Sequence, residues 1–401
     1  MRFITAAMTL VALTLVLVFT ASDAVTSAGP IDHRDGKKIF RYDTFGDEQL
    51  WTDVLRMHEA LRTVRPVDAL ALGVKVDSEA LPASLVAAIG RGEVDLTDPA
   101  VTVELIRLNA VVGVVGTVDE AGQLTRVGIT CALCHSTVDD SFAPGIGRRL
   151  DGWPAQDLDV GKIVSLSPAL DPALKAEFSA WGPGMYDPRH HAFDGVNIIP
   201  LNSPSLPVVI PPAYGLKGVG FETYTADGTI SYWNSYVGVG QMGGQGRFHD
   251  PRIGLHIEQQ PDLVTPKLPA LLAYQLSLRT PRAPKGSFSP RVAARGRRVF
   301  DTKAGCASCH SGPRYTDVGR GHRDPFLHHP EEVGTEPLYA ARTATGKYRT
   351  TPLRGLWHRT AFFHDGSATG LPAVVEHYDD QFKLGLTDQE KSDLVEFLKS
   401  L

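Results

Sequence analysis

The pattern Cys-x-x-Cys-His occurs twice in this chain, once as Cys131, Cys134 and His135 and once as Cys306, Cys309 and His310. On a turn of helix, residues three apart share a face, so the two thiols of a motif can form thioethers to the two vinyl groups of one porphyrin. The histidine that follows is then positioned to bind the iron. The pattern is typical of covalent haem attachment, and its two copies predict two c-type haems.

Other uses of these cysteines are possible in principle. A thioredoxin-like Cys-x-x-Cys would not need the histidine and would not occur twice. A zinc site wants four ligands, which the motifs could supply as four thiolates, but it would leave both histidines without a role. The motifs contain all four cysteines of the chain, so none remains for a structural disulfide.

The N-terminus has the pattern of an export signal. Arg2 is followed by an apolar stretch over residues 6–19 and by small residues over 21–28. This predicts a signal peptide over residues 1–28, cleaved near Ala24 or Ala28. An uncleaved membrane anchor is the alternative, for which the stretch is short. We therefore expect a periplasmic protein in an oxidising compartment.

Composition sets broad limits on the rest. The chain has 401 residues, of which 43% are hydrophobic and 21% charged, which is ordinary for a globular protein of about two domains. The formal net charge is −5 and no basic stripe is present, so we expect no nucleic-acid partner.

The second motif lies in the frame of a small cytochrome. Ser289-Pro290 predicts a helix start that leads to a helix ending near Gly305. Thr387 and Glu390 form a capping box ahead of a terminal helix. A helix before the haem motif and a helix at the end of the chain predict a C-terminal cytochrome c domain over residues 288–401.

The first half repeats this plan with insertions. Thr265-Pro266 predicts the start of its closing helix. Two positions are candidates for its opening helix, residues 36–40 and residues 51–64. We therefore predict an N-terminal cytochrome c-like domain over residues 29–280. The fold class is mostly α, with two cytochrome c-like domains, each around one covalent haem.

The insertions of the first domain are long loops and hairpins. Residues 110–129 predict a hairpin that turns near Gly122. Residues 183–251, rich in glycine and proline, predict loops and short strands over the first haem. Residues 279–287 carry two prolines and predict a stiff linker between the domains.

Three stretches carry a family resemblance: residues 305–317, residues 351–356 running on to His364-Asp-Gly366, and the terminal helix with its Leu-Thr-Asp lead-in. They resemble the bacterial dihaem cytochrome c peroxidases and their relatives, including the tryptophan-oxidising dihaem enzymes of methylamine metabolism. The resemblance covers roughly residues 268–401 well. It implies that the haem of the first domain reacts and the haem of the second stores an oxidising equivalent.

The resemblance also implies a calcium ion between the haems. Asn202, in the segment Asn-Ser-Pro-Ser-Leu, is similar to the asparagine that binds it. Thr335 and the carbonyl of Pro337 would lie on the other side of that site. Plain turn chemistry is the alternative for all three residues, because Asn-Ser-Pro and Glu-Pro are both prone to form turns.

The sixth ligand of the second haem cannot be a methionine of its own domain, because the methionines are Met1, Met8, Met57, Met185 and Met242. The resemblance places Tyr348 where the peroxidases have their methionine, as in the tryptophan-oxidising branch. A packed aromatic is the alternative, and His358 and His322 compete as ligands. His364 is expected to be a structural hydrogen-bonding group.

The distal side of the first haem is less defined. No histidine occurs between His135 and His190. The first iron is therefore open, or it is capped from afar by His190, His191, His249 or His256. The resemblance suggests Gln241, Gln245 and Glu258 as distal acid–base or hydrogen-bonding groups, and Trp233 as an electron relay between the haems. Ordinary packing or exposure is the alternative for each.

Together these features predict a periplasmic dihaem c-type oxidoreductase that reduces hydrogen peroxide or uses it to oxidise a partner. The expected partners are a small redox protein or other electron donor and hydrogen peroxide or dioxygen, and a homodimer is an option. Two other functions stay open: a dihaem electron-transfer cytochrome without turnover, and a dihaem oxygenase resembling the rubber oxygenases. The insert over residues 51–130 has no assigned role.

Overall fold

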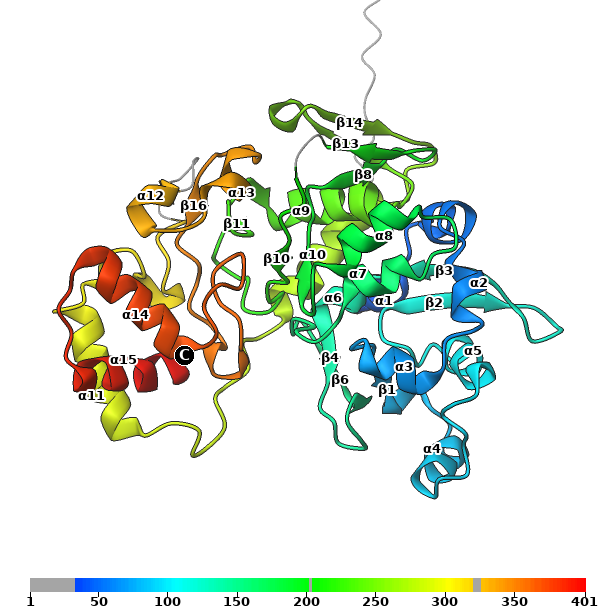
Figure 1. The fold of residues 1–401 in the computed structure, drawn as a ribbon, viewed down its shortest axis with the longest axis horizontal. Helices are drawn as coiled ribbons and strands as arrows, with labels where there is room; N and C mark the ends of the chain where they lie inside the picture. Colours follow the sequence, from blue (N-terminus) through cyan, green and yellow to red (C-terminus); the bar gives the residue numbers. More distant parts are fainter. Residues whose placement is uncertain (1–32, 202–203, 320–325) are drawn as a thin grey trace, which may run out of the picture. The chain divides into compact units, whose positions relative to one another are not determined.

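Glycine allows two pairs of helices to cross closely (Figure 1). α1 (His33–Tyr42) crosses α10 (Leu268–Ser277) at Gly36, where a Cβ atom would lie 2.0 Å from the carbonyl oxygen of Ala270. α11 (Pro290–Asp301) crosses α15 (Asp388–Lys399) at Gly296, where a Cβ atom would lie 1.8 Å from the carbonyl oxygen of Asp393. No side chain fits at either crossing.

The two crossings come from one repeated sequence pattern. The segments Gly36-Lys-Lys-Ile-Phe40 and Gly296-Arg-Arg-Val-Phe300 match in the type of residue at every position. Both phenylalanines are buried and pack edge-on against an aromatic ring of the partner helix, with Phe40 5.5 Å from Tyr274 and Phe300 5.2 Å from Phe397 between ring centroids. The predicted pair of bracing helices is therefore present around each haem motif.

The computed structural model describes residues 33–201, 204–319 and 326–401. The predicted signal peptide, Asn202 and His322 lie outside them. We refer to residues 33–280 as the first half and to residues 288–401 as the second half. Asp32–Leu401 form one compact unit, and the predicted domain boundaries stay a prediction.

The structure is mostly helical. Besides α1 and α10, the first half contains α2 (Met57–Leu61), α3 (Pro66–Ala71), α4 (Ala83–Gly90), α5 (Pro99–Arg107), α6 (Ala132–His135), α7 (Val160–Ser165), α8 (Pro172–Ser179) and α9 (Ile230–Tyr236). Besides α11 and α15, the second half contains α12 (Pro330–Val333), α13 (Pro337–Ala341) and α14 (Leu371–Phe382). Among the described helices, none has the length and apolar character needed to cross a membrane.

Short helical turns fill several connections. Two are π-helical: η1 (Gln49–Val54) and η3 (Val237–Gln241). The others are 3₁₀ turns: η2 (Ser78–Ala80), η4 (Pro251–Ile253), η5 (Thr265–Lys267), η6 (Cys306–Ser308), η7 (Gly312–Arg314) and η8 (Leu356–His358).

The described strands are short and pair two by two. The pairs are β1 (Val76–Asp77) with β5 (Ile146–Gly147), β2 (Val114–Val118) with β3 (Leu124–Ile129), β4 (Ser136–Val138) with β6 (Arg149–Asp151), β7 (Met185–Tyr186) with β10 (Val208–Val209), β8 (His191–Phe193) with β9 (Ile198–Pro200), β11 (Phe221–Glu222) with β12 (Gly228–Thr229), β13 (Arg247–Asp250) with β14 (Leu255–Glu258), and β15 (Leu327–His328) with β16 (Tyr348–Arg349). Only β1 and β5 pair in parallel among these.

Several local predictions are confirmed. The opening helix of the first half is α1, at residues 36–40, whereas residues 51–64 form η1 and α2. The predicted hairpin over 110–129 is β2–β3, and Thr387 with Glu390 forms the capping box of α15. Ser289 does precede α11, but its side chain makes no capping hydrogen bond.

Candidate functional site

Each haem motif closes a single helical turn. In the first, the backbone N–H of His135 donates to the carbonyl of Cys131 at 3.2 Å, and in the second that of His310 donates to Cys306 at 2.9 Å. Cys131 packs on the core around Phe40, and Cys306 packs on the separate core around Phe300. The four thiols therefore do not form one shared zinc site.

The two proximal histidines are oriented in the same way. Nδ1 of His135 lies 3.1 Å from the carbonyl oxygen of Pro211, and Nδ1 of His310 lies 3.0 Å from that of Tyr315. Because a carbonyl oxygen only accepts, Nδ1 must carry the hydrogen and Nε2 keeps a lone pair for a metal. Burial lowers the pKa of His135 to about 4 and also lowers that of His310, so both rings are neutral at neutral pH.

Three of the four motif thiols are not activated. Burial raises the pKa of Cys131 and of Cys134 to about 12 and that of Cys306 to about 11. Low-pKa thiolates characterise reactive redox cysteines, and these three thiols are of the opposite kind. All four cysteines are free of disulfides. The donor set of each motif, two thiols and one oriented imidazole, fits a covalent c-type haem.

A cavity begins at the first motif. It has about 130 Å³ of space for the centre of a water-sized molecule, and Cys134 and Leu133 lie in its wall. Most lining side chains are apolar, while Tyr186, Asp187, His191 and Gln241 supply a polar side. The cavity therefore fits a haem held at Cys134 with hydrogen-bonding groups facing it.

Gln241 is the predicted distal residue that the structure brings to this cavity. It ends the π-helical turn η3, a kind of turn that is frequent at functional sites. Its Oε1 accepts a hydrogen bond from the Tyr186 hydroxyl, and its Nε2 donates to the carbonyl of His191 at 2.6 Å and to the Tyr236 hydroxyl at 3.1 Å. These three contacts fix the orientation of the amide.

Gln245 and Glu258 are not among the described residues that line the cavity. The Nε2 of Gln245 donates to the carbonyl of Gln260 at 2.8 Å. Glu258 lies on the solvent face of β14, where buried and exposed side chains alternate. The structure thus separates both from the first haem cavity.

Of the four histidines considered as distant caps, His191 reaches the cavity. Burial lowers its pKa to about 4, with a further contribution from His190. His190 pairs with Glu177. His249 and His256 contact each other on the exposed face of the β13–β14 hairpin, with 3.0 Å between their Nδ1 atoms. His191 is therefore the cap candidate that geometry favours.

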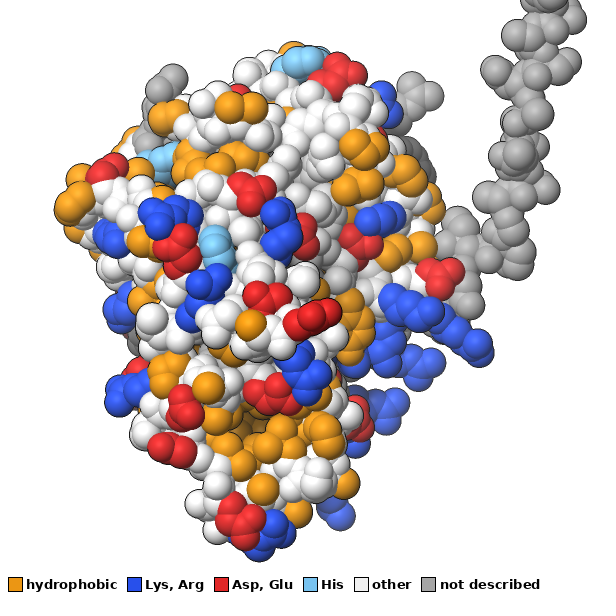
Figure 2. Space-filling view, turned by 90° about the vertical axis from the view of Figure 1, so that its right-hand side faces the viewer, with side chains coloured by type: hydrophobic (Ala, Val, Ile, Leu, Met, Phe, Trp, Pro, Cys, Tyr) orange, Lys and Arg blue, Asp and Glu red, His pale blue; other side chains and the backbone are white. Residues whose placement is uncertain are grey.

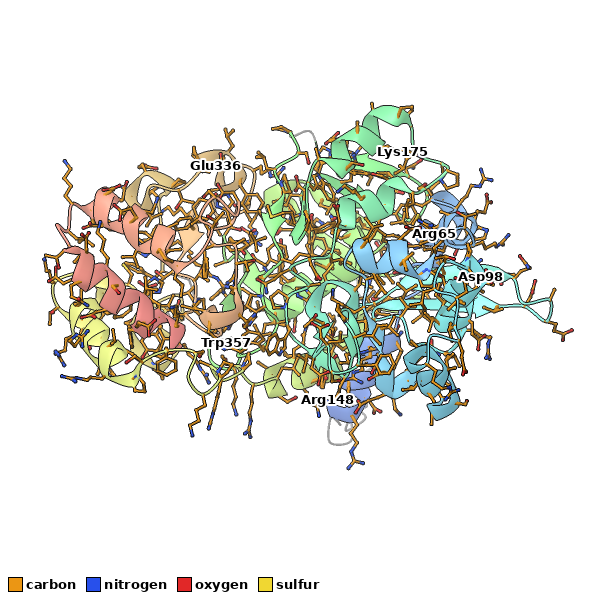
Figure 3. All side chains as sticks on the ribbon, turned by 60° about the horizontal axis from the view of Figure 1, so that its bottom comes forward. Arg65, Asp98, Arg148, Lys175, Glu336 and Trp357 are labelled. Carbon is orange, nitrogen blue, oxygen red and sulfur yellow. The ribbon has the colours of Figure 1, made fainter. Side chains whose placement is uncertain are left out.

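Tyr348 is engaged with protein groups rather than left free. Its hydroxyl donates to the carbonyl of Glu336 at 2.6 Å and lies 3.1 Å from Nε2 of His364. Glu336, labelled in Figure 3, is the N-cap residue of α13. Burial raises the pKa of Tyr348 above that of an ordinary phenol. The role of His364 is the hydrogen-bonding one expected from the sequence, and ligation by Tyr348 stays a prediction.

His358 lies against the first half. Its Nε2 is 2.7 Å from the hydroxyl of Tyr214, and its ring stacks on Trp153 with 4.3 Å between centroids. Trp357, which is labelled in Figure 3, also contacts Trp153, with 5.8 Å between ring centroids. On either side of Trp153, the N–H groups of Gly152 and Ala155 donate to carbonyls of the first haem motif, His135 and Cys134.

These four aromatic residues, Trp153, Tyr214, Trp357 and His358, form what we term the bridging cluster. It joins the first haem motif to the second half and was not predicted. Trp233, the predicted relay, is buried in the first core and its indole N–H donates to the carbonyl of Glu222 at 3.1 Å. The Glu222 carboxylate in turn pairs with Arg349 at 3.0 Å. Both routes thus reach the second half.

The calcium site stays a prediction. Pro337 occupies the first turn of α13, and Glu336 caps that helix by accepting from the N–H groups of Leu338 and Tyr339. The Thr335 N–H donates to the carbonyl of Pro330 at 2.9 Å. These contacts are turn and cap contacts.

Part of this chain is similar in sequence to known proteins. The Cytochrome c family model matches residues 293–401. The cytochrome-c peroxidase IdrP1 of Pseudomonas sp. (strain SCT) is 31% identical over 27% of this chain and 39% of its own length. The methylamine utilization protein MauG is 31% identical in Methylorubrum extorquens, over 27% of this chain and 34% of that protein, and 32% identical in Methylophilus methylotrophus, over 27% and 36%.

The homologues of this chain are members of the dihaem cytochrome c peroxidase and MauG family. The chain matches less than half the length of these relatives. The cytochrome c match covers the second motif and both of its bracing helices from residue 293 onward. The first motif, at Cys131, lies outside this match, and the two motifs together are consistent with two haem sites.

Proposed function

We propose that this protein is an exported, periplasmic dihaem c-type oxidoreductase that reduces hydrogen peroxide at the first haem, or uses it to oxidise a partner, with electrons relayed between the two haems. A small redox protein or another donor supplies the electrons. The observation that carries the proposal is the pairing of His191 and Gln241 on the polar side of the cavity at Cys134. When bound, the haems supply an iron that takes peroxide and a store for electrons.

Gln241 and His191, on this polar side, have different roles in the proposed cleavage of peroxide. The Gln241 amide is held by three hydrogen bonds, and its Oε1 keeps one lone pair to accept from a peroxide O–H. His191 is neutral above about pH 4. It can therefore take a proton from one peroxide oxygen and return it to the other, the transfer that cleavage requires.

The test is electron paramagnetic resonance of the resting protein together with peroxide consumption in the presence of a reduced donor. We expect a high-spin ferric signal that disappears when peroxide is added, and turnover of the donor. Two low-spin haems that stay low-spin after half-reduction, with no peroxide consumed, would disprove the proposal.

One observation favours a second function, that of an electron-transfer cytochrome without turnover. His191 lines the first cavity as a neutral imidazole, and such a ring is also a strong iron ligand. In that case the resting spectrum is low-spin and His191→Gly converts one haem to high-spin. If His191 is instead a proton carrier, the same variant leaves the resting spin state unchanged.

A further inference from the structure

A second cavity lies beside the first haem cavity. It has about 80 Å³ of space for the centre of a water-sized molecule and is lined mainly by the insert over residues 51–130, for which the sequence predicts no role. Its walls come from α2, α3, α5 and the β2–β3 hairpin, with Ile89 of α4 added. Figure 2 shows hydrophobic side chains gathered around a hollow on this side of the molecule.

The walls of this cavity offer no free hydrogen-bonding group from a side chain. Thr102 and Trp51 are the lining residues that carry a side-chain donor. The Thr102 hydroxyl donates to the carbonyl of Val64 at 2.7 Å, and the Trp51 indole N–H donates to the carbonyl of Met242 at 2.9 Å. Both donors are therefore occupied, and what faces the cavity is wholly apolar.

An apolar wall of this kind disfavours ligands that carry polar groups. A peptide, sugar or lipid headgroup would bury polar groups without hydrogen-bond partners, which is unfavourable. An apolar cavity stays dry and accepts apolar guests such as benzene or xenon. We infer that this cavity is a binding site for a small, hydrocarbon-like molecule without hydrogen-bonding groups.

The position of the cavity connects this ligand to the first haem. Trp51, Ile129 and Leu133 line both cavities, and Leu133 lies between the two haem cysteines in the sequence. A ligand in the apolar cavity thus touches the wall of the haem site. This deepens the proposed function and rests on it for the assignment of the haem site. It gives the reactive half a compartment for an apolar substrate.

Access to the cavity runs past partly exposed side chains. Ala69 and Leu70 of α3 and Ile89 of α4 line the cavity and are each partly exposed. α4 contains no buried residue. Val67, on the same helix as Ala69, is 36% exposed and is not a lining residue, so it provides a matched control.

The test is equilibrium dialysis of the haem-loaded protein against naphthalene, with naphthalene-2-sulfonate as a charged probe of the same shape. We expect about one naphthalene bound per chain and no binding of the sulfonate. Ala69→Phe, which fills the cavity, should weaken naphthalene binding at least tenfold, and Val67→Phe should bind as the wild type does. If Ala69→Phe does not fold, as judged by circular dichroism, Ile89→Trp serves in its place.

Three outcomes would overturn the inference: no naphthalene binding by the wild type, equal binding of the sulfonate, or unchanged binding by the filled variant. Dialysis does not depend on turnover, so a failure of peroxide reduction is seen separately. A shift of the absorbance of the first haem when naphthalene binds, lost in Ala69→Phe, is the expected sign that the two cavities share a wall.

Discussion

The two halves of this protein share the parts that hold a haem and differ in what surrounds it. In both, a glycine lets two helices cross, and in both, Nδ1 of the proximal histidine bonds to a backbone carbonyl. The first half adds the cavity with His191 and Gln241 and the apolar cavity of the insert. The comparison teaches that the repeated scaffold orients a proximal histidine in the same way in both halves, whereas the chemistry that we propose depends on the insertions of the first half.

The largest expected effect is on the rate of peroxide reduction, which we expect to depend on the cavity of the first half. His191→Gln should lower the rate of peroxide reduction by roughly 10²–10⁴-fold, because general acid–base catalysis contributes about that much. His256→Gln, on an exposed hairpin of the same half, is the control and should react as the wild type does. Equal rates for His191→Gln and the wild type would show that His191 in the first cavity does not take part in peroxide reduction.

A second prediction tests whether the scaffold is shared. Gly36→Ala and Gly296→Ala should each lower the free energy of unfolding by about 1–3 kcal/mol, the usual effect of overpacking. The added Cβ atom would lie 2.0 Å or 1.8 Å from a backbone carbonyl oxygen, which cannot move away as a side chain can.

Urea denaturation monitored by circular dichroism measures this effect. Gly90→Ala in α4 is the control, because the nearest atom to its Cβ is 3.8 Å away. Stability unchanged in one of the two crossing variants would mean that the halves are braced differently.

A third prediction concerns the contact between the halves. Trp153→Leu removes the ring that stacks on His358 and should slow electron transfer between the haems, measured by flash reduction of one haem. Trp233→Leu removes the route through Glu222 and Arg349, and comparison of the two variants shows which route carries the electron. If neither variant slows transfer, the haems exchange electrons without these rings.

The smallest expected effect is that of pH on stability. Burial lowers the pKa of His191 in the first half and of His358 in the second to about 4. A histidine in an unfolded chain titrates near 6.5, so the unfolded state binds protons first as the pH falls. The unfolding free energy should therefore decrease between about pH 6.5 and pH 4.

Urea midpoints at pH 7 and pH 5 measure this decrease. His191→Gln and His358→Gln should each make it smaller, whereas the exposed His256→Gln should not. If the decrease in stability between pH 7 and pH 5 is the same in all three variants, the groups that cause it are neither His191 nor His358.

Local signals explain what the sequence could predict of the fold. The Cys-x-x-Cys-His motifs, the capping box of α15 and the β2–β3 hairpin depend on neighbouring residues, and all are present. Two segments, residues 36–40 and 51–64, are candidates for the opening helix of the first half, and the first of them lies in α1. The repeat of Gly36–Phe40 in Gly296–Phe300 is the signal that would have identified it.

The candidate site was harder to predict because its residues meet through the tertiary fold. Gln241 and His191 are far apart in the chain and are joined by a side chain to carbonyl hydrogen bond. Trp153 and His358 come from different halves. Glu258 could have been excluded, because in Leu255-His-Ile-Glu258 the apolar residues alternate with the polar ones, and a strand places alternate side chains on opposite faces.

The most direct test of the central claim is the intact mass of the purified, exported protein after acid denaturation. The account predicts a polypeptide that carries two haems, and one haem in each of the double variants Cys131→Ala/Cys134→Ala and Cys306→Ala/Cys309→Ala. The mass of the bare chain in the wild type, or of a chain with a single haem, would contradict it.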